Sequence, residues 1–108
     1  MKIKRTVSRE ILVDVLKKGR VQHSPLFSIR ILPSPFSACT AIVSKKVAKT
    51  AVARNRAKRR VRDIVALLLN KCTQTFTVVV FLNKSIEKIS VVVLKQEITL
   101  ALTKLKVL

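Results

Sequence analysis

The sequence contains very few of the side chains that proteins use for chemistry. Its 108 residues include five carboxylates, one histidine, one glycine, and no tyrosine or tryptophan. Paired catalytic carboxylates, a Ser-His-Asp triad or a His/Cys metal cage would need residues that the chain mostly lacks. We therefore expect neither catalytic residues nor a metal site in the protein. His23 has no acidic neighbour in the sequence and is predicted at a surface or turn position.

Cysteines and long apolar runs are also scarce. Cys39 and Cys72 are isolated and form no CxxC pair, so we expect reduced thiols in a cytoplasmic protein and not a disulfide. The longest apolar run, Ile64–Leu69, has six residues, far fewer than the roughly 18 of a membrane span. Residues 1–9 are basic but precede no apolar segment typical of a signal peptide. These features predict a cytoplasmic protein without a membrane partner.

Positive charge, in contrast, is abundant. Lys and Arg together number 23, which gives a formal net charge of +18, and 49% of the residues are hydrophobic. The apolar content is sufficient for a folded core, and the length fits a single domain over residues 1–108. Self-repulsion on this scale favours a polyanionic partner, namely RNA, DNA or an acidic surface.

Hydrophobic periodicity predicts three helices and four strands. We expect helices over 8–18, 50–71 and 90–106, and strands over 21–24, 26–32, 38–44 and 75–82. Ser8 and Ser90 are candidate N-caps, and Gly19 can close the first helix. The turn at 33–37 predicts that the two strands beside it pair with each other in antiparallel fashion. The strand 75–82 is apolar on both faces and is predicted to be central and parallel. The β-branched residues 91–93 also suit a strand, but the helical period continues to residue 105.

The predicted helix 50–71 has one apolar face and one cationic face. Its apolar positions recur at helical spacing, while arginines and Asn55 occupy the opposite side. The window 45–62 holds nine basic residues and no acidic one. A solvated basic face usually mixes charges of both signs, so this window indicates nucleic-acid binding. The four phenylalanines are too few for an extended stacking platform and are predicted in the core.

This basic segment resembles the signature of the protein subunit of bacterial ribonuclease P. Residues 44–46 read S-K-K, and seven residues later 54–63 read R-N-R-A-K-R-R-V-R-D. Residues 12–20 resemble the end of the family's first helix, residues 77–81 its hydrophobic strand, and residues 89–105 its last helix. The resemblance covers residues 4–106.

The resemblance implies an α+β fold. The expected architecture is a single-domain α/β sandwich of order αβββαβα, with a four-stranded sheet and an unusual left-handed crossover into the arginine-rich helix. Family members bind a catalytic RNA subunit and help it remove the 5′ leader from precursor tRNA. The implied partners are this RNA and the precursor tRNA, with no other protein required, and Mg²⁺ belongs to the RNA–protein holoenzyme.

The resemblance also assigns two sets of site residues. Together with the basic window, it places on the RNA-subunit side Arg54, Asn55, Arg56, Lys58, Arg59, Arg60, Arg62, Lys45 and Lys49. It places in a leader-binding cleft Leu12, Leu16, Arg30 and Lys46.

The sequence departs from the family pattern at several of these positions. The family usually has aromatic rings at the positions of Leu12 and Leu16 and often at that of Arg30. Arg30 can stack its guanidinium or contact a phosphate, whereas the two leucines offer apolar contact or belong to the core. Ala48 replaces a frequent glycine, so its turn must avoid positive φ or accept strain. Asp63 replaces the usual glutamate.

Two other functions remain open at this point. A small basic ribosomal or ribonucleoprotein-assembly protein would share the charge and size of this chain. A nuclease made of protein alone would have to cleave RNA with five scattered carboxylates, which is the least favoured interpretation.

Overall fold

The computed structural model describes residues 9–107, which form three helices and four strands in the predicted order αβββαβα. The elements in chain order are α1 (Arg9–Lys18), β1 (Arg20–His23), β2 (Phe27–Pro33), β3 (Ala38–Ile42), α2 (Ala51–Leu69), β4 (Phe76–Leu82) and α3 (Val91–Lys104). The proposed N-cap Ser8 lies outside the described residues. The ambiguous segment after residue 90 is helical, and the Ser90 hydroxyl accepts from the Val93 N–H at 3.2 Å as an N-cap.

The four strands form one mixed sheet in the order β1-β2-β4-β3. The apolar strand β4 is central, as predicted, and it runs antiparallel to β2 and parallel to β3. The predicted pairing between β2 and β3 is wrong, because β4 lies between them. Those two strands run in opposite directions, as a short turn requires, but they are not neighbours.

Hydrogen bonds across the start of β4 explain this arrangement. The loop from Ser34 to Ser37 passes over that end of β4, and the Ser34 N–H donates to the Thr75 carbonyl at 3.1 Å. The Thr75 hydroxyl donates back to the Ser34 carbonyl, and the Thr77 hydroxyl contacts the Ser34 hydroxyl at 3.0 Å. Four extended residues reach about 13 Å, and two strand spacings need about 10 Å. The loop is therefore long enough to bridge β4 instead of forming a hairpin.

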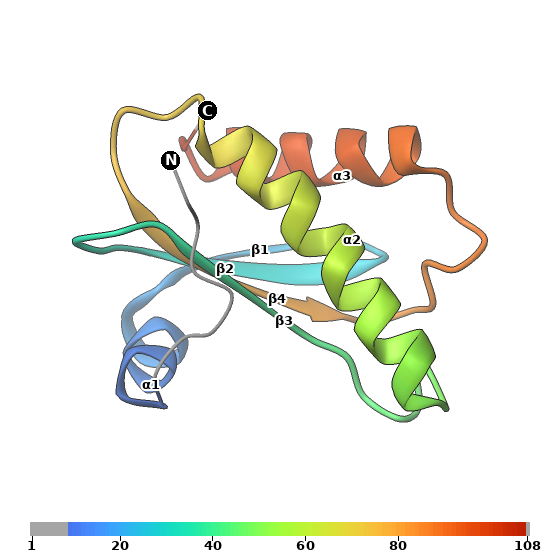
Figure 1. Cartoon of the computed structure of the whole chain (residues 1–108). Coiled ribbons are helices and arrows are strands. Elements are labelled where there is room, and N and C mark those ends of the chain that lie inside the picture. The colour runs from blue at the N-terminus through green and yellow to red at the C-terminus, as the bar shows by residue number, and fades with distance from the viewer. Residues whose placement is uncertain (1–8, 108) are drawn as a thin grey trace.

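The helices lie on both faces of the sheet (Figure 1). Helices α2 and α3 cover one face, where β2 contributes Phe27, Ile29 and Ile31 to the main hydrophobic core. These three residues are fully buried, and the intervening residues of β2 are half-buried, so burial alternates along the strand. The face of α2 that was predicted to be apolar supplies the buried residues Val61, Ile64, Val65 and Leu68.

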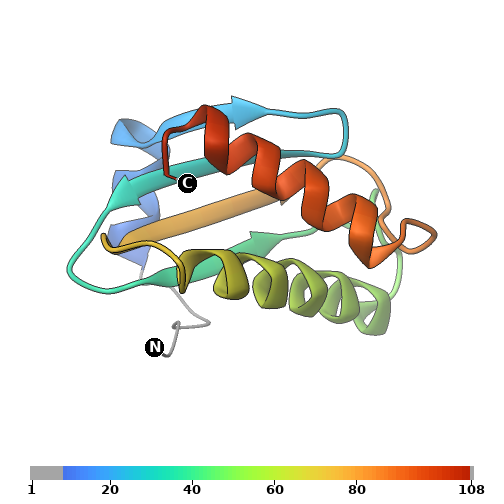
Figure 2. The same ribbon diagram turned by 90° about the horizontal axis from the view of Figure 1, so that it is seen from above.

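The connection from β3 through α2 to β4 joins two neighbouring parallel strands. Figure 2 shows that β3 and β4 point the same way while α2 runs back in front of them, and that the path forms a left-handed crossover. Such connections are right-handed in about 98% of cases. The expectation drawn from the family resemblance is therefore confirmed against the general rule.

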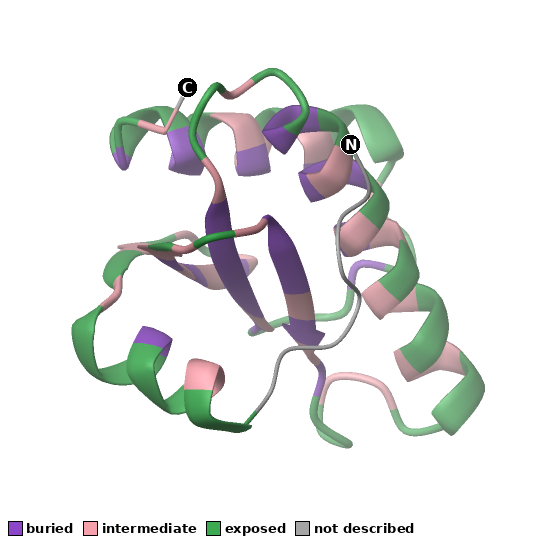
Figure 3. Cartoon of the chain, turned by 60° about the vertical axis from the view of Figure 1, so that its left-hand side comes forward, coloured by how far each residue is buried: buried purple, intermediate pink, exposed green. Residues whose placement is uncertain are grey.

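Within residues 9–107, the opposite face of the sheet is covered only in part, by the short helix α1 (Figure 3). Val15 is the buried residue of α1, and Val79 and Thr77 of β4 are buried on this face. Farther along the same face, Thr40, Ile42 and other side chains are only half-buried. We call this partly uncovered region the open sheet face, defined by His23, Ser28, Arg30, Thr40, Ile42 and Phe81.

Gly19 ends α1 at a point where the helix closely approaches β2. Its N–H donates to the Val15 carbonyl at 2.9 Å, so it closes the helix as predicted. It does so without a positive φ. A Cβ at this position would lie 2.4 Å from the Val15 carbonyl oxygen and 2.9 Å from that of Ile31. Close backbone approach, and not turn conformation, is what requires glycine here.

Both cysteines are free, as predicted, with Cys39 buried and Cys72 half-buried. Of the helices in residues 9–107, none is long and apolar enough to cross a membrane.

Candidate nucleic-acid interface

Helix α2 begins at a defined cap and presents its arginines in two ways. The Thr50 hydroxyl accepts from the Ala53 N–H at 3.1 Å and starts the helix. We call Asn55, Arg56 and Arg59 the outer flank, because all three side chains are exposed. We call Arg54, Arg60 and Arg62 the inner flank, because they are half-buried against neighbouring segments. The predicted cationic face is therefore divided into an exposed part and an enclosed part.

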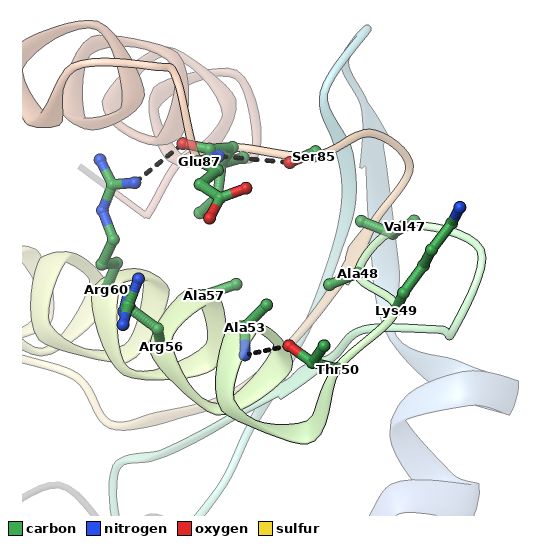
Figure 4. Close-up of a pocket in the computed structure, with 11 residues that line it drawn as sticks. Val47, Ala48, Lys49, Thr50, Ala53, Arg56, Ala57, Arg60, Ser85 and Glu87 are labelled. Atoms are coloured by element: carbon green, nitrogen blue, oxygen red, sulfur yellow. Dashed lines mark hydrogen bonds between the residues drawn. The ribbon is translucent and has the colours of Figure 1, made fainter.

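Arg60 on the inner flank binds the loop between β4 and α3. Its guanidinium donates to the Ile86 carbonyl at 2.8 Å and to the Ile89 carbonyl at 2.6 Å. Figure 4 shows the Arg60 side chain directed toward this loop and away from Arg56. The two bonds fix the β4–α3 loop next to α2, so Arg60 stabilises the packing of this loop against the helix.

Arg54 has a similar role at the start of the helix. Its guanidinium donates to the carbonyls of Ala48 and Lys49, each at 3.1 Å. Ala48 and Val47 in turn donate their N–H groups to the Ser44 carbonyl, which forms a compact turn after β3. Among the described non-glycine residues only Lys106 has a positive φ. The turn at Ala48 therefore avoids positive φ, as the missing glycine requires.

Arg62 lies close enough to Cys39 to affect the thiol. Burial raises the pKa of Cys39 to about 12, and the positive charge of Arg62 opposes part of this effect. A thiol with this pKa is protonated at neutral pH and is inert as a nucleophile. Lys58, the remaining cation of the predicted helix set, is half-buried.

The predicted lysines of the β3–α2 connection are all accessible. Lys45, Lys46 and Lys49 are exposed between the end of β3 and the start of α2. They extend the positive surface of the outer flank toward the C-terminal end of β3. Lys46 was predicted on the leader side, and it follows the strand end where the open sheet face terminates.

The structure brings together two of the residues predicted in the leader-binding cleft. The Arg30 guanidinium donates to the Leu16 carbonyl in the last turn of α1 at 3.3 Å. This contact places a cation at the negative end of the helix dipole. Leu16 is 38% exposed and therefore does not belong to the core, while Leu12 is half-buried. Arg30 and the last turn of α1 at Leu16 therefore form one edge of the open sheet face.

Sequence reasoning missed two ring-bearing residues of the open sheet face. The strand register aligns His23 with Ser28, Ser28 with Phe81, and Phe81 with Ile42. The Nδ1 atom of His23 lies 3.1 Å from the Ser28 hydroxyl. His23 is exposed, as predicted, whereas Phe81 is half-buried and not part of the core, unlike Phe27 and Phe76. No sequence spacing indicates this row, because it exists only through cross-strand register.

The acidic side chains do not form a metal site. Within residues 9–107 no group of three or more His, Cys, Asp or Glu side chains could hold a metal ion. Four of the five carboxylates lie on the three helices, with Asp63 alone on α2, and Glu87 lies on the β4–α3 loop. The donor set of the described residues does not fit a protein-bound Mg²⁺, which prefers several oxygen ligands in octahedral geometry.

Comparisons with known proteins agree on one family. A family model described as Ribonuclease P matches residues 2–106. The chain is 33% identical over 103 residues to the ribonuclease P protein component of a Pseudanabaena species, covering 93% of this chain and 89% of that protein. It is 45% identical over 53 residues to the component from Thermus aquaticus, covering 49% of this chain. That match spans only 32% of the Thermus protein.

Solved structures show the same fold. The RNase P protein of Staphylococcus aureus superposes with a TM-score of 0.80 at 19% identity, covering 98% of both chains. The RNase P protein of Thermotoga maritima gives 0.78 at 20% identity, covering 94% of this chain and 96% of that one. The family match over nearly the whole length also decides against a ribosomal or assembly protein. The chain belongs to the ribonuclease P protein family.

Proposed function

We propose that this chain is the RNA-binding subunit of a cytoplasmic ribonuclease P that removes the 5′ leader from precursor tRNA. In this proposal the outer flank of α2 binds a catalytic RNA, and the open sheet face receives the single-stranded leader. The observation that carries the proposal is the exposed outer flank, where Arg56 and Arg59 lie one helical turn apart with their side chains open to a partner.

The outer flank is suited to phosphates because its charges are unsatisfied by the protein. In the described structure neither the Arg56 nor the Arg59 guanidinium donates a hydrogen bond to the protein. The two residues are three apart on a helix and repel each other by a few tenths of a kcal/mol. A phosphate between them removes this repulsion and accepts bidentate bonds.

The open sheet face is suited to an unpaired strand. Ile42 and Phe81 offer apolar surface for bases, Arg30 offers a cation, and His23 and Ser28 offer polar groups beside them. Single-stranded nucleic acids are bound by this combination of stacking surfaces and positive charge. In this chain Phe81 and His23 stand in for the rings that are missing at positions 12, 16 and 30.

The chemistry of cleavage belongs, in this proposal, to the RNA. Mg²⁺ supplies a nucleophile and a Lewis acid when RNA phosphates hold it, and the described protein residues offer it no site. The protein contributes positive charge, which reduces repulsion between two polyanions and strengthens substrate binding. No further protein subunit is required.

Reconstitution tests the proposal. The purified chain is mixed with a bacterial ribonuclease P RNA, and cleavage of a 5′-labelled precursor tRNA is followed at low and high Mg²⁺. We expect the protein to lower the Mg²⁺ requirement and to strengthen precursor binding. The proposal fails if both quantities are the same with and without the protein.

The leader path is tested with a matched pair of variants. Arg30→Ala removes a cation from the open sheet face, and Lys104→Ala removes one from α3 on the other side of the sheet. Arg30→Ala should weaken binding of a precursor with a leader several-fold and leave mature tRNA binding unchanged. Lys104→Ala should change neither. Equal effects of the two variants on the leader-bearing precursor would contradict the assignment.

A further inference from the structure

A pocket lies between the N-terminal half of α2 and the loop from β4 to α3, on the side of the sheet opposite α1. Its volume is about 460 Å³, within the roughly 300–1,000 Å³ of small-ligand clefts. Apolar side chains form its walls, namely Val47, Ala48, Ala53, Ala57 and Ile86. The polar residues that line it are Lys49, Thr50, Arg56, Arg60, Ser85 and Glu87. The pocket lies on the other side of the sheet from the leader path, and Arg56 is the one residue that it shares with the outer flank.

Two alanines and the hydrogen bonds of Arg60 keep the pocket open. Ala53 and Ala57 are one helical turn apart and leave space where larger side chains would fill it. The Arg60 guanidinium holds the carbonyls of Ile86 and Ile89, which fixes the loop that forms the opposite wall. The pocket is therefore formed before any ligand arrives, which reduces the ordering cost of binding.

A carboxylate is directed into this otherwise basic region. Figure 4 shows the Glu87 side chain extending from the loop toward Ala53 and Ala57. Within the described residues the Glu87 carboxylate accepts no hydrogen bond from the protein, although its backbone N–H donates to the Ser85 hydroxyl at 3.4 Å. An ionised carboxylate only accepts hydrogen bonds. Glu87 is exposed, so its carboxylate is free to accept from an occupant that presents donors at this point, whereas a phosphate would be repelled by its charge.

Of the three cations that line the pocket, Arg60 is bonded to the loop, while Lys49 and Arg56 lie at opposite ends in Figure 4, with Lys49 beside Val47 and Arg56 beside Arg60. A ligand that complements these side chains presents an apolar body to Ala53 and Ala57, donates to Glu87, and carries anionic groups on either side. One nucleotide within an RNA strand meets all of these conditions, because a phosphate flanks its base on each side.

We infer that this pocket binds a single unpaired guanine of an RNA strand. The Watson–Crick edge of guanine has two adjacent N–H donors, which match the two oxygens of one carboxylate. Adenine and cytosine place a ring acceptor beside their amino group, and uracil places carbonyls beside its single N–H, so each of them would repel the carboxylate. The preference for guanine is argued from the pocket alone. That the guanine belongs to an RNA strand rests on the proposed function.

Direct binding to the purified chain tests the inference without any cleavage assay. GMP, AMP, CMP and UMP are titrated into ¹⁵N-labelled protein, and amide chemical shifts are followed. We expect GMP to bind at least about tenfold more tightly than AMP, since a bidentate base contact discriminates by roughly 1–3 kcal/mol. The affected amides should be those of Ala53, Ala57 and Glu87. Equal binding of GMP and AMP, or shifts confined to the open sheet face, would overturn the inference.

A variant of Glu87 and a matched control test whether this carboxylate causes the preference for GMP. Glu87→Gln replaces one acceptor oxygen by a donor and should reduce the preference for GMP over AMP to within about threefold. Glu10→Gln makes the same change at an exposed position on α1 and should leave the preference intact. An unchanged preference in Glu87→Gln would overturn the role of the carboxylate.

The shape of the pocket is tested in the same way. Ala53→Leu fills the pocket and should abolish GMP binding, whereas Ala51→Leu adds the same side chain at an exposed position of α2 outside the pocket. Alanine and leucine are both good helix formers, so the two variants should fold alike. GMP binding by a folded Ala53→Leu protein would contradict the site.

The source of the base is decided with oligonucleotides. The RNA pentamer AAGAA should bind more tightly than AAAAA, and Glu87→Gln should remove the difference. If GMP binds selectively but the two pentamers bind equally, the ligand is a free nucleotide and the assignment to RNA is wrong. A failed reconstitution of cleavage would leave these binding results unaffected, so the two proposals fail separately.

Discussion

Arg59 and Arg60 are adjacent on α2, yet their surroundings differ completely. Arg60 is half-buried and donates to two backbone carbonyls of the β4–α3 loop. Arg59 is exposed on the outer flank and is available to a partner. The same residue type therefore stabilises the fold on the inner flank and, in our proposal, binds RNA on the outer flank. A count of arginines overstates the RNA-binding surface, because part of the charge is already hydrogen-bonded.

The difference between Arg60 and Arg59 is tested most strongly by removing the guanidinium of Arg60. Arg60→Met keeps the aliphatic stem but leaves two carbonyls without their charged donor, and we expect the free energy of unfolding to fall by about 2 kcal/mol. Urea denaturation measures this change. Arg59→Met is the control and should stay within about 0.5 kcal/mol of the parent. Equal losses in the two variants would remove the distinction between the flanks.

The outer flank is tested by RNA binding. Arg56→Ala combined with Arg59→Ala should weaken binding to the catalytic RNA about tenfold or more at low salt and reduce the salt slope by about two units. The melting temperature should not fall. Lys71→Ala with Lys104→Ala removes the same charge from exposed positions elsewhere and should keep most of the slope. An unaltered slope in the arginine pair would mean that another surface binds the RNA.

The buried thiol of Cys39 makes the stability of the protein depend on pH in the alkaline range. The pKa of Cys39 is about 12 in the folded protein and 9.0 for the free side chain. The unfolded chain therefore loses this proton first, and stability decreases as pH rises above 9, by about 1 kcal/mol per pH unit. Denaturation at pH 8 and pH 10 should show this loss relative to Cys39→Ala, which lacks the thiol. The same pH dependence in both proteins would show that Cys39 is not its source.

The smallest effect concerns the cap that both flanks share. Thr50→Ala removes the acceptor for the Ala53 N–H and should lower stability by about 1 kcal/mol. The salt slope of RNA binding should remain, because no exposed arginine is changed. A Thr50→Ser variant keeps the acceptor and should restore most of the stability, whereas a changed slope in Thr50→Ala would indicate that Thr50 contacts RNA itself.

Local signals in the sequence were sufficient to predict the positions of the helices and strands. Every helix and strand is found within about two residues of its predicted range, because periodicity and capping residues act over short distances. The central position of β4 also followed from its apolar faces. The separation of β2 from β3 could not be predicted from the sequence. It arises because contacts of Ser34 with Thr75 and Thr77 lead the loop across β4. Such contacts join residues about forty positions apart and leave no local pattern.

For the candidate RNA-binding site, the sequence likewise predicted the general surface but not the role of each residue. The basic window indicated a polyanion-binding helix, and the motif at 44–63 indicated its family. The division of its arginines was not predictable, because it depends on where the β4–α3 loop packs. Phe81 was assigned to the core on the basis of residue type, and only the strand register shows it on the open sheet face beside Ser28.

The sequence by itself determined that this chain is a single basic domain with an amphipathic, arginine-rich helix and too few acids for its own active site. Composition and short-range periodicity are sufficient for those conclusions. The tertiary structure decided the left-handed crossover, the row of His23 and Phe81, the enclosed role of Arg60, and the pocket over Ala53 and Ala57. Each of these depends on contacts between distant segments, whose geometry is set by how the helices and the sheet pack together.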